Sequence, residues 1–134
     1  MNATEEIRLE RRFAHSTAAL WSALTDPTLL AKWWAAGDVR PIAGHRFALD
    51  MGPWGKQPCE VLAVEPERLF AFRFAVGTLD TTITWRLAPD GDGTSLTLTH
   101  SGFDVSAPMG RGAYEGMRAG WPGVLSRLDA TLAG

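Results

Sequence analysis

The chain has 134 residues, a formal net charge of −2, one cysteine (Cys59), six tryptophans and six phenylalanines. These values exclude an intramolecular disulfide and the basic surface of a nucleic-acid-binding protein, and no apolar run approaches the ~18 residues of a membrane span. The charged N-terminus has no signal-peptide pattern, so we expect one cytoplasmic domain over residues 1–134.

The first third of the sequence predicts a strand followed by two short helices. Residues 5–13 alternate between apolar and polar, which is typical of a half-buried strand. Ser16 is a good N-cap for a first helix. Asp26 followed by Pro27 starts a second helix, because Asp caps it and Pro suits its first turn. A turn-rich loop follows over residues 37–44.

The middle of the sequence predicts a run of antiparallel strands joined by short turns. The expected strands are residues 46–51, 57–65, 68–75, 80–87 and 94–101. Short connections favour antiparallel neighbours, since parallel pairing needs long crossovers. Both faces of residues 68–75 are apolar, so alternation leaves the orientation of Phe70, Phe72 and Phe74 open.

The last segment, residues 109–132, has apolar residues at three- and four-residue steps and predicts a long helix. Pro122 lies inside this pattern and should kink or restart the helix. Gly112, Gly116 and Gly120 share one face. They indicate either a smooth strip that approaches the sheet or leaves room for a ligand, or a frayed loop before a helix that starts near Trp121.

These elements predict an α+β helix-grip fold, in which a curved antiparallel sheet of about six strands wraps around a long C-terminal helix. The two short helices follow the first strand. A twisted sheet is wide compared with one helix, so a cavity between the two is a natural outcome.

Five stretches resemble the START-like helix-grip superfamily, also called SRPBCC, and within it the branch named after the activator of the heat-shock protein 90 ATPase. They are ALWSALTDPTLLAKWW (19–34), RPIAGHRF (40–47), VLAVEPERL (61–69), GTSLTLTHSGF (93–103) and GWPGVLSRL (120–128). The resemblance implies the helix-grip fold and no single reaction, because members of the superfamily bind lipids, hormones and polyketides, and some are enzymes. The short loop over residues 37–44 departs from the family pattern and predicts a trimmed first part of the sheet.

Aromatic and apolar side chains on the expected inner face are candidates for lining the cavity. The candidate ligand-binding residues are Trp33, Trp34, Phe47, Met51, Trp54, Phe72, Trp85, His100, Met117 and Trp121. Most of them also serve as ordinary core in this architecture. Trp54, in a turn, is read as a lid, as an interface contact, or as a side chain folded back on the rim.

Three titratable residues are candidates for chemistry. His100 shares the inner face with Leu96 and Leu98, where it would either act on a ligand or be a hydrogen-bonded structural histidine. Arg73, if it faces inward, needs a partner such as Glu60, and otherwise it faces solvent. The histidines have no metal-ligand spacing, so we expect neither a metal site nor a cofactor.

Three functions are compatible with this pattern. The first is binding of a small hydrophobic molecule, lipid-like or aromatic, in the cavity. The second is a cyclase, dehydratase or hydrolase that uses the same cavity. The third, implied by the name of the resembling branch, is a stress-related, co-chaperone-like protein that binds a chaperone. A homodimer through Trp54 or the glycine strip is also compatible with the sequence.

Overall fold

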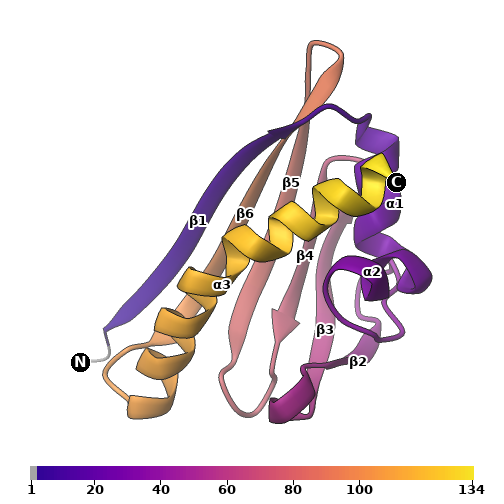
Figure 1. Cartoon of the computed structure of the whole chain (residues 1–134). Helices are drawn as coiled ribbons and strands as arrows, with labels where there is room; N and C mark the ends of the chain where they lie inside the picture. The colour runs from indigo at the N-terminus through magenta and orange to yellow at the C-terminus, as the bar shows by residue number, and fades with distance from the viewer. Residues whose placement is uncertain (1–2) are drawn as a thin grey trace.

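The computed structural model describes residues 3–134 (Figure 1). Its elements are β1 (Thr4–Phe13), α1 (Thr17–Thr25), α2 (Pro27–Trp33), β2 (Arg46–Asp50), a 3-10 turn η1 (Gly52–Trp54), β3 (Lys56–Glu65), β4 (Leu69–Phe74), β5 (Thr81–Asp90), β6 (Gly93–Asp104) and α3 (Pro108–Ala133). They follow the order predicted from the sequence. Among the described residues, no helix is long and apolar enough to cross a membrane.

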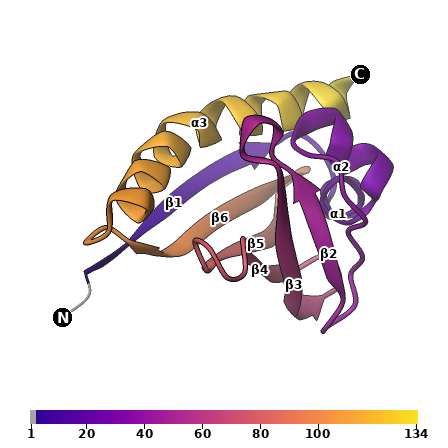
Figure 2. The same cartoon turned by 90° about the horizontal axis from the view of Figure 1, so that it is seen from below.

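The six strands form one antiparallel sheet in the order β1-β6-β5-β4-β3-β2. Strands β2 to β6 follow one another as a meander, and β1 closes the far side by pairing with β6. β2 has only 5 residues and is the shortest strand of the sheet. The sheet bends so that α3 lies along its concave side (Figures 1 and 2).

The two short helices begin at the predicted caps. Ser16 Oγ accepts a hydrogen bond from Ala19 N at 3.1 Å, and Asp26 Oδ1 accepts one from Thr28 N at 2.8 Å. These bonds satisfy amide groups that have no partner within the first turn of a helix. The indole of Trp33 then donates to the carbonyl of Ala23 at 3.0 Å, which fixes α2 against α1.

The inner face of β4, which alternation left open, carries all three phenylalanines. Phe70, Phe72 and Phe74 are buried and lie opposite Trp85, Ile83 and Thr81 of β5. Arg73 lies between them in the strand and points to the outer face, where Asp80 contacts it at 3.2 Å. The orientation follows from which face α3 covers.

β6 contains an irregularity that the alternation of its sequence does not show. Ile7 of β1 pairs with His100, and Glu5 pairs with Phe103, so two steps on β1 match three on β6. Gly102 has φ +87°, a conformation that a residue with a side chain adopts only with strain. The extra residue on β6 forms a β-bulge at Gly102. The bulge brings His100 and Phe103 to the same inner face, where their rings are 4.4 Å apart.

α3 is continuous from Pro108 to Ala133, so the frayed-loop interpretation is wrong. The expectation of a smooth glycine strip against the sheet is also wrong. Gly112, Gly116 and Gly120 face open space, and a methyl group on any of them would meet no atom within 4 Å. The close approach is instead at Gly110, where a Cβ would overlap the backbone carbonyl of Asp104.

Candidate functional site

Six rings gather between α3 and the concave face of the sheet and are called here the aromatic cluster: Trp34, Phe72, Phe74, Trp85, His100 and Trp121. The ring of Trp121 lies 5.2 Å from that of Trp34 and 5.6 Å from that of Trp85. Trp34 also contacts Phe72 at 6.4 Å and Phe74 at 6.2 Å. The fold thus brings together five of the ten predicted lining residues, from the C-cap of α2 and from β4, β5, β6 and α3.

The space where the sequence predicted a cavity is filled by these rings. Trp85, His100 and Trp121 have exposed fractions of 1%, 0% and 3%. A void that holds water would expose its walls, so these values indicate close packing. Trp34 is half-buried and lies at the edge of the cluster.

His100 is held by two side chains in this otherwise apolar region. Trp121 Nε1 donates a hydrogen bond to His100 Nδ1 at 3.2 Å, and His100 Nε2 lies 2.8 Å from Thr81 Oγ1. Burial lowers the pKa of His100 from its ordinary value of 6.5 to about 3, because a charged imidazole would lose its hydration. The ring is therefore neutral near physiological pH.

The other predicted lining residues lie around the aromatic cluster or away from it. Trp33 is buried and stacks on Trp34 at 6.2 Å, and Phe47 is buried against Phe72 at 5.6 Å. Met51 and Met117 are half-buried beside the core. Trp54 is 76% exposed, so it neither folds back on the rim nor covers the cluster. The 3-10 turn η1 directs it into solvent.

Glu60 and Arg73 are neighbours across β3 and β4. Arg73 faces the outer side of the sheet, so the pair with Glu60 that an inward Arg73 would need does not form. Arg73 pairs with Asp80 at 3.2 Å, and Glu60 contacts Arg46 at 3.8 Å. Both pairs are accessible to solvent on the outer face of the sheet. The structure therefore separates these two residues from His100, which lies on the inner face.

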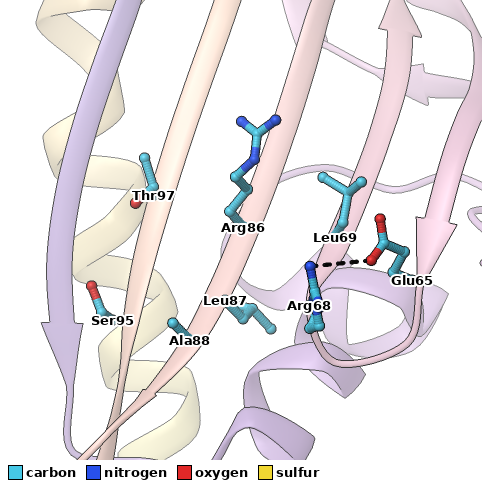
Figure 3. Close-up of a pocket in the computed structure, with 8 residues that line it drawn as sticks. All are labelled: Glu65, Arg68, Leu69, Arg86, Leu87, Ala88, Ser95 and Thr97. Carbon is cyan, nitrogen blue, oxygen red and sulfur yellow. Dashed lines mark ion pairs between the residues drawn. The ribbon is translucent and has the colours of Figure 1, made fainter.

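Two hollows stand out on the surface, and no member of the aromatic cluster lines either one. The larger, about 450 Å³, lies on the outer face of the sheet, with the helix behind the strands (Figure 3). Arg86, Ser95 and Thr97 point into it, and Arg68 is paired with Glu65 at 3.3 Å (Figure 3). The smaller, about 190 Å³, lies where β1 meets the first half of α3, beside Tyr114.

Sequence reasoning missed Thr81 and Phe103, which complete the surroundings of His100. Thr81 was detectable, because it is in phase with Ile83 and Trp85 and is a polar residue on an apolar face. Phe103 was not, because strict alternation places it on the outer face and only the bulge at Gly102 turns it inward.

Among the described residues, no group of three histidine, cysteine, aspartate or glutamate side chains is placed to hold a metal ion. Cys59 is buried, and burial raises the pKa of its thiol to about 12, which disfavours the reactive thiolate. The aromatic cluster itself offers a ligand apolar contact and the hydrogen-bonding nitrogens of His100.

Solved structures of the same shape exist. Protein MLL2253 from Mesorhizobium loti has 34% sequence identity and a TM-score of 0.86, over 96% of this chain and 97% of that one. Protein BH1534 from Bacillus halodurans has 28% identity and a TM-score of 0.84, over 98% and 99%. DynU16, described as a protein in the dynemicin biosynthetic locus, has 25% identity and a TM-score of 0.80, over 96% of this chain and 47% of DynU16.

No functionally curated protein is similar enough to count as a match. The family model described as activator of Hsp90 ATPase homolog 1-like protein matches residues 14–133. This match extends from the end of β1 to the end of α3, and the sheet order and the long last helix are those of the helix-grip fold. The chain therefore belongs to the Hsp90 ATPase activator homolog 1-like family of the START-like helix-grip superfamily.

Proposed function

We propose that this protein binds a small, flat, apolar molecule between the concave face of the sheet and α3, and that the first half of α3 loosens to admit it. The ligand takes up a position among the rings of the aromatic cluster. The proposal combines a surface suited to such a molecule with a helix that is packed unevenly along its length.

The uneven packing of α3 is the observation that carries the proposal. Its large buried side chains, Trp121, Leu125 and Leu128, all lie in the second half. In the first half only Gly110 is buried, while Tyr114 and Met117 are half-buried. The 190 Å³ hollow beside Tyr114 lies at this same end. Displacing the first half uncovers Tyr114, Met117 and the ring of Phe103 beneath Tyr114, but neither Leu125 nor Leu128, so it costs less than displacing the second half.

The sequence at the junction of the two halves favours motion there. Pro122 has no amide hydrogen, so the carbonyl of Arg118 lacks its usual partner within the helix. Gly120 and Gly123 flank this position, and each glycine costs a helix interior about 1 kcal/mol relative to alanine. Trp121, which fills the centre of the aromatic cluster, stands at this weak point.

The chemistry of the aromatic cluster defines the kind of ligand. Its walls are tryptophan and phenylalanine rings, and its only hydrogen-bonding groups besides the indoles belong to His100 and neighbouring Thr81. Such a surface favours a flat, uncharged molecule over an ion, which would lose its hydration without compensation. The description of DynU16 as a protein in a biosynthetic locus supports a small molecule as the ligand.

The test is a titration with 2-methoxynaphthalene, which is flat, uncharged and without a hydrogen-bond donor. Indole N–H signals of the six tryptophans report where it binds in a nitrogen-15 NMR spectrum. We expect saturable one-to-one binding that moves the signals of Trp34 and Trp121 and leaves that of exposed Trp54 unchanged. Binding that does not saturate, or shifts confined to Trp54, would contradict the proposal.

Two glycine variants test the loosening of α3. Gly116→Ala adds a methyl group in open space in the first half, and Gly123→Ala adds one in the second half, where the nearest atom is 4.0 Å away. Both should stabilise helix by about 1 kcal/mol. We expect both variants to weaken binding by about fivefold, because the closed state gains that energy in the first half or at its junction. Wild-type affinity in Gly116→Ala would show that the first half does not loosen.

A further inference from the structure

The hydrogen bonds around His100 have one possible direction. An indole N–H only donates, so His100 Nδ1, which lies 3.2 Å from Trp121 Nε1, must present its lone pair. The proton of the neutral ring is then on Nε2, which donates to Thr81 Oγ1 at 2.8 Å. Thr81 Oγ1 in turn donates to the carbonyl oxygen of Phe74 at 3.5 Å. The tautomer of His100 is thus fixed by its neighbours.

The two partners of His100 are anchored differently. Thr81 belongs to β5, between β4 and β6 in the middle of the sheet. Trp121 belongs to α3, at the junction weakened by Gly120, Pro122 and Gly123. When the first half of α3 loosens about this junction and Trp121 moves away with it, Nε2 keeps its bond to Thr81, whereas Nδ1 loses its bond to Trp121. The opened site then contains one unpaired acceptor, surrounded by the rings of Phe74 and Phe103.

We propose that His100 Nδ1 is the polar recognition point of the site, and that the ligand is a flat, uncharged molecule with one O–H or N–H donor that replaces the indole of Trp121. This inference rests on the proposed function, since it names the ligand class for the same site. Thr81 is a positioning residue in this scheme, because it holds the tautomer and does not touch the ligand.

The same geometry defines which molecules the site rejects. A ligand without a donor leaves Nδ1 buried and unpaired, which is costly in a region without water. A carboxylate brings oxygen lone pairs toward the nitrogen lone pair and must also lose its hydration. The site therefore selects a phenol or an N–H heterocycle over the corresponding ether or acid.

A matched pair of ligands tests this selection. 2-Naphthol and 2-methoxynaphthalene share one ring system, and only the first has a donor. We expect 2-naphthol to bind the wild-type protein about tenfold more tightly, measured by calorimetry. Equal affinities would overturn the role of His100 and leave the proposed function standing. If neither compound binds, the proposed function fails as well.

Substitutions of His100 and Thr81 test whether their hydrogen bonds cause the preference for 2-naphthol. In His100→Phe the ratio of the two affinities should fall to about one, because the acceptor is gone. Thr81→Val should reduce the ratio, because it frees the tautomer, and Thr81→Ser should keep it, because the hydroxyl remains. An unchanged ratio in His100→Phe and Thr81→Val would overturn the proposal. If His100→Phe does not fold, the nitrogen-15 shifts of His100 in the wild-type protein decide: Nδ1 must remain the unprotonated nitrogen with and without 2-naphthol.

Discussion

At the scale of single residues, His100 shows how a polar side chain is accommodated in an apolar core. It has an exposed fraction of 0%, and both ring nitrogens have a partner. A buried polar group without a hydrogen bond is costly, so Thr81 and Trp121 are as necessary to the position as the histidine itself. The alternation of apolar and polar residues in β6 predicted that His100 faces inward. The structure shows that two hydrogen bonds make the buried imidazole acceptable there.

The lowered pKa of His100 predicts a loss of stability in mild acid. The unfolded chain takes up a proton near pH 6.5, whereas the folded protein does so only near pH 3. Between these values the unfolded state binds more protons, so the free energy of unfolding falls as the pH is lowered. From pH 7.5 to pH 5.5 this group should remove about 1.4 kcal/mol, measured by urea unfolding.

The control for this prediction is His100→Phe, which has no group that titrates at this position. Its stability should be lower than that of the wild-type protein at pH 7.5 but should change less between pH 7.5 and pH 5.5. His15 and His45 are present in both proteins, so their contributions cancel in the comparison. The same loss in both proteins would mean that His100 is not the residue responsible.

At the scale of elements, α3 is a single helix with two differently packed halves. Leu125 and Leu128 anchor the second half, which Arg127 also ties to the end of α2 through a 3.2 Å hydrogen bond to the carbonyl of Trp33. The first half is held at its start, where Gly110 packs on the backbone of Asp104. Its middle has no comparable anchor, because Gly112 and Gly116 offer no side chain.

Alanine substitutions at Gly110 and Gly112 should have opposite effects on stability. Gly110→Ala places a methyl group against the carbonyl of Asp104, so we expect a loss of about 1–3 kcal/mol from overpacking. Gly112→Ala meets no atom within 4 Å and should gain up to about 1 kcal/mol from helix propensity. Urea unfolding followed by circular dichroism measures both, and equal effects would contradict the assigned packing.

At the scale of the whole molecule, the fold joins a densely packed body to a helix segment with few buried side chains. The middle strands β4, β5 and β6 are paired on both sides and carry buried rings such as Phe70, Trp85 and Phe103. α1 and α2 are capped, and they pack on this body through Trp21 against Phe70 and Trp33 against Trp85. The first half of α3 lies over the β1 side of the sheet, near the N-terminal end of the described chain (Figure 1).

Hydrogen exchange should reveal this division. We expect the amides of residues 111–119 to exchange at least about tenfold faster than those of residues 124–132, after correction for intrinsic rates, because fewer buried contacts hold them. The amides of β5 should be among the slowest. Mass spectrometry of labelled peptides measures all three regions. Uniform protection along α3 would remove the physical basis for loosening of the helix.

The order of the elements was determined by the sequence alone, because the signals that define them are local. Ser16 and Asp26 mark the helix starts, the turns between strands are short, and the apolar spacing after Pro108 fits a long helix. Inward positions such as Trp85 and His100 followed from alternation, which a regular strand obeys. The site residues on these elements were therefore predictable as members of one face.

Only the tertiary structure decided how that face is used. The orientation of Phe72 depends on which side α3 covers, and Phe103 turns inward through a bulge at Gly102 that alternation does not encode. The predicted cavity is filled because Trp34, Trp85 and Trp121, which are distant in sequence, meet at the same place. The free volume between a sheet and a helix depends on how many side chains from distant parts of the sequence pack together, so no local sequence pattern predicts it.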